Sequence, residues 1–398
     1  MTALAQKALV TPPINAAPVA ANTIVDITKR YGVSPLRQLR EMATLRFARG
    51  KLDGHEYYTT GAFRPDQSMD QKKEYVGHTS SFAVNEACSP LKLTEIRAFI
   101  RDKVPYSELL HQYGLPATET QAVLTPARFF GRVPTLRTAE DAKAFLRNDA
   151  RYPLFAKPVE GRESVGSVRI DATGADGVDL HLGNGKVVSL DAFVAEIVAD
   201  YPEGYIFQTA VHQHPDLTAI TGPVIGTMRY ITLWDGDWPR LLYAVWKLPS
   251  PRAMSDNYWQ KGSMAGQLDR ETGKLLRVRR GMAHQIEELT HHPVSGVSFD
   301  GFTFPHWKEI ERVACDAHAM YPEMGLIGWD MAVGPDGPVI IEANDNPFHN
   351  LYQITHDRGV RHPEMDEAFT RAAARSQSIL RNKIDVFQAR QKVRAGKA

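Results

Sequence analysis

Cysteine is scarce in this sequence, and an excess of one charge and long hydrophobic runs are missing from it. Its two cysteines, Cys88 and Cys315, are too few for a disulfide framework or a cysteine-based zinc site. With 47 basic and 46 acidic residues the net charge is +1, so no general attraction to nucleic acid or to an anionic membrane is implied. Because no run of roughly 18 apolar residues occurs, we expect no membrane span. These absences predict a protein of the reducing cytoplasm.

The first 22 residues are rich in alanine and proline and contain one charged side chain. A secretory signal needs a basic start and an unbroken apolar stretch, and Pro12 and Pro13 interrupt any such stretch. We therefore interpret residues 1–22 as a disordered leader.

Residues 23–101 have a mostly helical pattern. In the run SPLRQLREMATLRFARG, Ser34 is a candidate N-cap that precedes a proline, and a glycine follows the run. Its apolar residues, among them Leu36, Leu39 and Leu45, fall on one broad helical face that we expect to be buried.

The pattern changes near Tyr152, where short β-like runs separated by glycine turns begin. At the other end, residues 361–398 predict a basic amphipathic helix, which favours a docking helix over an arm for membranes or nucleic acid. A chain of this length can hold two or three domains. The mixture of elements predicts an α+β fold, divided at 23–101, 102–212, 213–360 and 361–398.

The segment 326–346, LIGWDMAVGPDGPVIIEANDN, predicts a β-hairpin. A loop at 334–338 places Asp330 opposite Glu342 when residues are counted back along both strands. Because side chains alternate between the two faces of a strand, Asn344 shares the face of these carboxylates. The apolar residues of the hairpin then share the opposite face: Trp329, Met331, Val333, Ile341 and Ala343.

Two carboxylates in direct cross-strand register repel each other unless something neutralises them. Mg²⁺ would do so, because it takes oxygen ligands and is typically held by one or two carboxylates together with substrate phosphates. We predict that Asp330, Glu342 and Asn344 hold Mg²⁺, or Mn²⁺ in its place. Neutralising either carboxylate should then cost little stability in the metal-free protein. The alternative is a solvated strand face that ends in an Asn-Asp-Asn-Pro turn.

A lysine followed by a turn of small residues fits a bound phosphate. Lys157 ends the run LFAKPV and leads into the turn EGRESVGS at 160–167, whose N–H groups can point at phosphate oxygens. The turn matches no nucleotide-binding fingerprint, so an ordinary hairpin turn is the alternative. Arg229 is either a surface arginine or a cation for the transferred phosphate. Asp256 and Asn257 are ordinary turn residues if they have no role in a site.

In order, these segments resemble the ATP-grasp superfamily and, within it, the sugar-transfer-associated ATP-grasp proteins, relatives of the carboxylate–amine ligases. The resemblance extends from about Ser34 to Gln353 and is strongest after Tyr152. It implies an ATP-grasp fold in which subdomains 102–212 and 213–360 hold ATP between antiparallel sheets. It rests on the order and spacing of DK at 102–103, FAKPVEGRESVGS, YIFQTAVHQHPDL, GTMRYITL, SDNYWQKGS, ETGKL, FPHW and GWDMAVGPDGPVIIEAN.

The resemblance also implies a role for each matching residue. Lys157 should contact the α- and β-phosphates, the turn at 162–167 should close over them, and the backbone of residues 208–210 should contact adenine. Gln213 or His214 should reach the ribose. The residues expected to bind ATP are Lys103, Lys157, Ser164, Gly166, Ser167, Gln208, Thr209, Ala210, Gln213, His214 and Asp256. The residues expected at the transferred phosphate are Arg229, Lys247 and Asn257, beside the metal ligands Asp330, Glu342 and Asn344.

The implied reaction transfers the terminal phosphate of ATP to a carboxylate, and an amine then attacks the acyl phosphate. A kinase of the same fold that acts on a hydroxyl, and a nucleotide-binding protein without activity, are the alternatives. The expected partners are small-molecule carboxylate and amine substrates and not nucleic acid. A homodimer could form through the helical N-terminal region or the C-terminal helix.

Overall fold

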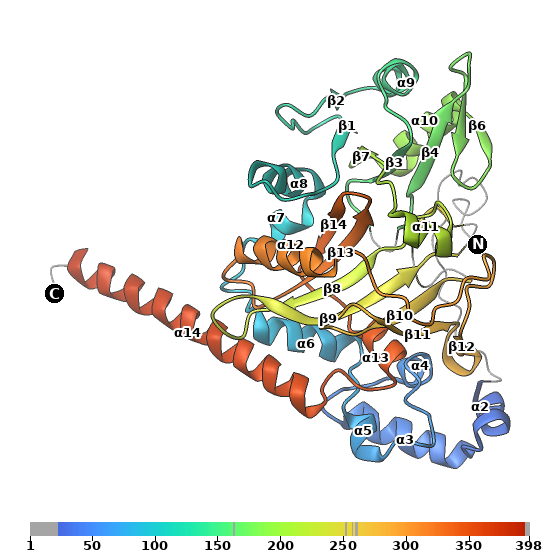
Figure 1. The fold of residues 1–398 in the computed structure, drawn as a ribbon. Helices are drawn as coiled ribbons and strands as arrows, with labels where there is room; N and C mark the ends of the chain where they lie inside the picture. Colours follow the sequence, from blue (N-terminus) through green and yellow to red (C-terminus); the bar gives the residue numbers. More distant parts are fainter. Residues whose placement is uncertain (1–22, 162–163, 251–252, 257, 259–261, 395–398) are drawn as a thin grey trace.

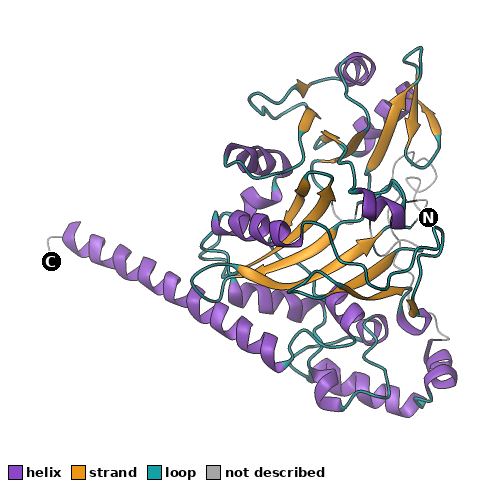
Figure 2. Cartoon of the chain, in the orientation of Figure 1, coloured by secondary structure: helices purple, strands orange, loops and turns teal. Residues whose placement is uncertain are grey.

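Two seven-stranded sheets form the centre of the computed structural model, which describes residues 23–161, 164–250, 253–256, 258 and 262–394 (Figure 1). Helices precede the sheets in the chain, and one long helix follows them. Figure 2 shows this long helix extending away from the sheets. This is the α+β class expected from the sequence. The expected leader, residues 1–22, lies outside the described residues.

The first sheet has the strand order β2-β1-β7-β3-β4-β5-β6. Its neighbouring strands are antiparallel except for the parallel pair β1 and β2. Helices α9 (Ala139–Asn148) and α10 (Leu190–Asp200) share a hydrophobic core with it. The strands are β1 (Thr120–Leu124), β2 (Thr135–Leu136), β3 (Leu154–Pro158), β4 (Val168–Thr173), β5 (Asp179–Leu182), β6 (Val187–Ser189) and β7 (Tyr205–Thr209).

The second sheet is antiparallel throughout, with the order β12-β11-β10-β9-β8-β13-β14. Helix α12 (Trp307–Ala319) packs on one face, and α6 (His78–Cys88), α13 (Asn350–His356) and α14 (Pro363–Arg394) contribute to the core of the other. The strands are β8 (Met228–Leu233), β9 (Arg240–Leu248), β10 (Met264–Leu268), β11 (Leu275–Arg280), β12 (Glu287–Leu289), β13 (Leu326–Gly334) and β14 (Gly337–Asn344).

Alternation along the central strands of this second sheet decides where charged side chains point. Met228 and Tyr230 on β8, and Trp246 on β9, belong to the core beneath α12. Arg229 and Lys247 therefore point to the opposite face, because successive side chains of a strand alternate.

The N-terminal helices form a separate small core around Tyr57, Tyr58 and Phe63. They are α2 (Thr23–Tyr31), α3 (Pro35–Phe47), α4 (Gly54–Thr59) and α5 (Met69–Lys73). Helices α7 (Arg97–Arg101) and α8 (Lys103–Gln112) follow α6 and belong to other cores. Ser34 caps α3 as expected, since its side chain accepts a hydrogen bond from the N–H of Arg37.

The face of α3 that is buried differs from the expected one. Leu36 and Leu39 are 78% and 54% exposed, and only Leu45 of the expected residues is buried. Polar Glu41 is buried instead, where it forms an ion pair of 2.6 Å with the buried Lys72 and accepts a hydrogen bond from the hydroxyl of Tyr57. The helix therefore packs through a polar network that hydrophobic periodicity cannot show.

Helix α14 has two parts with different surroundings. Its first part packs on α6, and Met365, Phe369 and Ser376 are buried there. Its second part projects away from the rest of the chain (Figure 1). No helix in the described ranges is both long and apolar enough to cross a membrane.

Candidate functional site

The hairpin β13–β14 brings the two predicted carboxylates together, with a turn and a strand register that differ from those expected. Its turn is shorter than expected, because Gly334 already pairs with Gly337. A β-bulge at Ile341 then restores the register, so that Asp330 still pairs directly with Glu342. The bulge also means that Ile340, and not Ile341, joins the apolar core.

Asp330 is held by two cations of the same sheet. Its carboxylate accepts hydrogen bonds from Nε of Arg229 at 2.6 Å and from Nζ of Lys247 at 3.1 Å. Burial by itself would raise the pKa of Asp330, but the charges of Arg229 and Lys247 outweigh burial and lower that pKa to about 2. The negative charge of Asp330 is therefore neutralised by the protein itself, and not by a metal ion alone as the pair of facing carboxylates predicted.

Lys247 links Asp330 to a second carboxylate. Nζ of Lys247 lies 3.0 Å from the carboxylate of Asp256, which also accepts hydrogen bonds from the N–H and hydroxyl of Thr227. Burial lowers the pKa of Lys247, but Asp256 and Asp330 raise it by more, so the net shift is upward. The result is a buried chain of alternating charges. Its predicted neighbour Asn257 lies outside the described residues.

Glu342 and Asn344 are half-buried on the edge strand β14. Within the described part of the chain, the Glu342 carboxylate has no hydrogen-bond or ion-pair partner, and the side-chain nitrogen of Asn344 is buried without one. The described ranges contain no cluster of three His, Cys, Asp or Glu residues suited to a metal. The predicted set of two carboxylates and one amide is still compatible with Mg²⁺, which takes oxygen ligands from few protein groups.

Lys157, on the first sheet, interacts electrostatically with this site. It lies on β3 and is 8% exposed, and burial lowers its pKa to about 8. The neighbouring charge of Lys103 lowers the pKa further, whereas Glu342 and Asp330 raise it. A strand lysine of one sheet thus interacts electrostatically with the carboxylate pair of the other sheet.

The predicted phosphate turn is ordered by its own hydrogen bonds where the structure describes it. Ser164 and Gly166 have positive φ angles of 58° and 77°. The hydroxyl of Ser167 donates to the carbonyl oxygen of Ser164 at 2.7 Å, and Tyr205 donates to that of Gly166. Arg162 and Glu163 of the same turn lie outside the described residues.

Lys103 ties helix α8 to the start of this turn. The side-chain nitrogen of Lys103 donates to the carbonyl oxygens of Val159 at 3.2 Å and Gly161 at 3.5 Å. The two lysines predicted to bind phosphate therefore lie near each other, since Lys103 contributes to the pKa shift of Lys157.

The predicted adenine segment uses several of its polar groups within the protein. The N–H groups of Thr209 and Ala210 donate to the carbonyl oxygens of Glu119 and Pro153. The side chain of Gln208 donates to the hydroxyl of Thr118 at 2.9 Å. A base at this edge would therefore have to bind other groups of the segment.

The two candidates for a ribose contact also have structural partners. Gln213 donates to Thr221 at 2.8 Å and accepts from the N–H of Gly226 at 2.8 Å, which fixes the loop before β8. His214 caps α11 (Pro215–Thr221), with its side chain accepting from the N–H of Asp216.

Two side chains beside the site were not predicted from sequence. The hydroxyl of Tyr106 is buried without a partner among the described residues, and it interacts electrostatically with Glu342 and Asp330. His349 lies 2.8 Å from the hydroxyl of Tyr243, and burial lowers its pKa to about 3. Neither carries a sequence signal, because each lies in a helical or loop segment that long-range folding brings to the site.

Similar proteins are found among solved structures but not among curated sequences. No curated protein sequence matches the chain. Solved structures similar to it include the D-alanine-D-alanine ligase from Coxiella burnetii, at 14% identity and a TM-score of 0.43, with 76% of this chain and 64% of that chain covered. The ATP-grasp ligase PsnB, complexed with precursor peptide PsnA2 and AMPPNP, has 12% identity and a TM-score of 0.36, with 70% and 61% covered.

The L-amino acid ligase from Bacillus licheniformis has 14% identity and a TM-score of 0.34, with 66% of this chain and 44% of that chain covered. The chain thus spans less than two thirds of the length of each of these three ligases. At the level of sequence, the family described as sugar-transfer associated ATP-grasp matches residues 89–367, more than half of the chain, and the chain therefore belongs to this family.

Proposed function

We propose that the chain is an ATP-dependent ligase that converts a carboxylate to an acyl phosphate and joins it to an amine, with release of ADP and phosphate. Family membership supports the use of ATP. The observation that carries the proposal is the electrostatic interaction of the buried Lys157 on one sheet with Asp330 and Glu342 on the other. A buried lysine with a lowered pKa gains from a polyphosphate, whose negative charge adds to that of Asp330 and Glu342 and favours the protonated form.

The nucleotide would be held mainly by groups of the first sheet. Lys157 and Lys103 would neutralise phosphate charge, and the turn with Ser164 and Gly166 would cover the phosphates. Glu342, Asn344 and Asp330 would ligate Mg²⁺ or Mn²⁺, which when bound neutralises charge on the phosphates. In ATP-dependent phosphoryl transfer, positioning and charge neutralisation supply most of the catalysis.

Arg229 and Lys247 are suited to the transferred phosphoryl group. Both side chains are largely buried and already oriented by Asp330 and Asp256, so little reorganisation is needed when a phosphate arrives. Cations held in this way can neutralise charge that develops on the acyl phosphate oxygens. No side chain is required as a covalent nucleophile in this scheme.

We also propose that the reaction takes place in the cytoplasm. Cys88 and Cys315 are free and buried. Burial raises the pKa of both thiols to about 12, so neither is a reactive thiolate at neutral pH. Such thiols fit a reducing compartment.

Turnover with carboxylate and amine panels should yield ADP and phosphate, and not AMP and pyrophosphate. The phosphorus NMR spectrum of the reaction measures this directly. Hydroxylamine, added in place of the amine, should convert the acyl phosphate to a hydroxamate that a ferric assay detects. Pyrophosphate would contradict the proposal, and a stable phosphate ester of an alcohol substrate would establish a kinase instead. The variant Lys157→Met is the control for a contaminating ATPase.

A further inference from the structure

The projecting part of α14 exposes apolar side chains that the fold does not cover. Beyond Lys383 every residue as far as Arg394 is exposed. Val386, Phe387 and Val393 are 50%, 62% and 65% exposed, which is unusual for apolar residues so close together. Eighteen residues of helix, 377–394, extend for about 27 Å at 1.5 Å per residue.

The apolar side chains of this segment form two stripes with a row of cations between them. Ile379, Val386 and Val393 follow one another at intervals of seven residues and so align along the helix. Leu380, Ile384 and Phe387 form the second stripe. On a helix of 3.6 residues per turn, Lys383, Arg390 and Arg394 lie between the two stripes. We call this arrangement of three cations between two apolar stripes the basic ridge.

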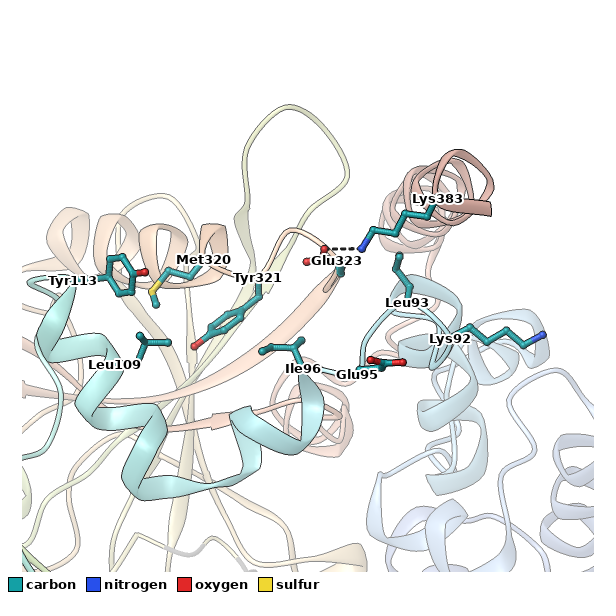
Figure 3. A pocket seen from close by; sticks show the side chains of 10 residues that line it. All are labelled: Lys92, Leu93, Glu95, Ile96, Leu109, Tyr113, Met320, Tyr321, Glu323 and Lys383. Atoms are coloured by element: carbon teal, nitrogen blue, oxygen red, sulfur yellow. Dashed lines mark hydrogen bonds and ion pairs between the residues drawn. The ribbon is translucent and has the colours of Figure 1, made fainter. Parts of the chain in front are cut away.

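A shallow depression of about 490 Å³ lies along the basic ridge, and all the residues that line it belong to α14: Ile379, Asn382, Lys383, Val386, Phe387 and Arg390. A recess of about 670 Å³ lies at the base of the helix (Figure 3). The side chain of Lys383 lines both, and its nitrogen donates to Glu323 at 2.9 Å.

Charge decides which kind of partner fits this surface. Residues 379–394 carry five basic side chains and one aspartate, so the net charge of the segment is +4. A second copy of the same helix would bring like charges together, which disfavours association. An anionic membrane surface would need the apolar residues on one face and the cations on the other. Here the cations lie within the apolar surface, where they would be drawn toward hydrocarbon.

We propose that the projecting part of α14 docks an acidic amphipathic helix of another protein. Carboxylates of the partner would pair with Arg390 and Arg394, since Lys383 already pairs with Glu323, and its apolar side chains would cover the two stripes. Apolar side chains at seven-residue intervals are typical of helices that pair side by side. This surface is remote in the chain from the ATP site and does not depend on the proposed reaction.

A synthetic peptide can test the proposal. The probe is a fluorescent 18-residue helix with a row of glutamates between two stripes of leucine, and its matched control has lysine at every glutamate position. We expect fluorescence anisotropy to show binding of the acidic peptide alone. Double substitution Arg390→Glu with Arg394→Glu, on the ridge, should weaken it at least tenfold. Arg381→Glu with Lys392→Glu makes the same charge change on the opposite side and should weaken it less than threefold.

Three results would overturn the proposal. The first is equal loss of binding in the two double variants, which would indicate unspecific charge attraction. The second is binding of the chain to phosphatidylserine vesicles but not to the peptide. The third is a stable dimer in sedimentation that Val386→Asp dissociates, which would assign the face to a second copy. Circular dichroism and ATP turnover, unchanged in all variants, would show that the fold is intact.

Discussion

Asp330→Asn is expected to destabilise the protein by about 3 kcal/mol without nucleotide, although it removes one of two facing negative charges. The carboxylate of Asp330 is the shared partner of Arg229 and Lys247, both largely buried. Removing one member of a buried ion pair leaves the other charges uncompensated and typically costs 3–5 kcal/mol. We take the lower end of this range because Lys247 keeps its second partner, Asp256.

The pH dependence of the stability difference between the native protein and Asp330→Asn is a second test of the ion pairs of Asp330. The pKa of Asp330 is lowered from 3.8 to about 2 in the fold. A carboxylate with a lowered pKa stabilises the fold fully above its unfolded pKa and loses that contribution as the pH falls through its folded pKa. The difference in stability between the native sequence and Asp330→Asn should therefore be constant above about pH 4 and shrink between pH 4 and pH 2.

Glu342→Gln is the matched control, since it makes the same chemical change on the paired residue. Glu342 has no ion-pair partner among the described residues, so its loss should change stability by less than about 1 kcal/mol. The same change should lower Mg·ATP turnover by about 10²-fold or more, as loss of one strong charge contact does. Urea unfolding and turnover titrated with Mg²⁺ measure the two effects. If Asp330→Asn were as stable as the native protein, the cation pairing described for Asp330 would be wrong.

The carboxylate pair shows what the sequence could and could not predict. Alternation of side chains along two strands placed Asp330 opposite Glu342, but with a loop at 334–338 that the structure does not have. It could not show the two-residue turn or the compensating bulge at Ile341, because a register shift leaves no mark in the residue pattern. Nor could it show that Arg229, two strands' width from Glu342, neutralises Asp330, since that contact depends on the order of strands in the sheet.

For helix α3 in the N-terminal region, the start was predicted correctly and the buried face was not. The start of α3 follows from local chemistry, because Ser34 and the proline after it act within one turn. The buried face of α3 does not follow from local chemistry. Glu41 on this face pairs with Lys72, thirty-one residues away, and Leu36 is exposed. Local signals thus predicted where α3 begins and that Asp330 opposes Glu342, but not the pairing nearer the turn, where Val333 opposes Pro338. Contacts distant in sequence decided which charges are paired and which faces are buried.

Lys157→Met is expected to stabilise the nucleotide-free protein and to abolish most of its ATP-dependent activity. Burial lowers the pKa of Lys157 from 10.5 to about 8. The folded state therefore carries the cost of a buried cation, about 3 kcal/mol at 1.36 kcal/mol for each pKa unit. Below pH 8 this lysine is protonated in both states, so the cost is fully present. Between pH 8 and 10.5 the unfolded state binds more protons, and the stability of the native sequence rises with pH.

Methionine has a similar shape and no charge, so Lys157→Met should raise the free energy of unfolding at pH 7 by up to about 3 kcal/mol. This gain should disappear near pH 10.5. If Lys157 binds phosphate, Mg·ATP should stabilise the native protein at pH 7 but not the variant. ATP affinity of the native protein should also weaken as the pH rises above 8, because neutral lysine attracts phosphate less. Turnover of the variant should fall by about 10²–10³-fold.

Lys103→Met separates this effect from a general loss of positive charge. Lys103 donates to the carbonyl oxygens of Val159 and Gly161 and is only half-buried, so its removal should not stabilise the protein. It should instead raise the pKa of Lys157, because a neighbouring cation is lost. Thermal unfolding from pH 7 to 10.5, with and without Mg·ATP, compares the three proteins. A Lys157→Met variant that is less stable than the native protein, and that ATP still stabilises, would make Lys157 a structural residue. The nucleotide would then have to bind elsewhere than between the two sheets.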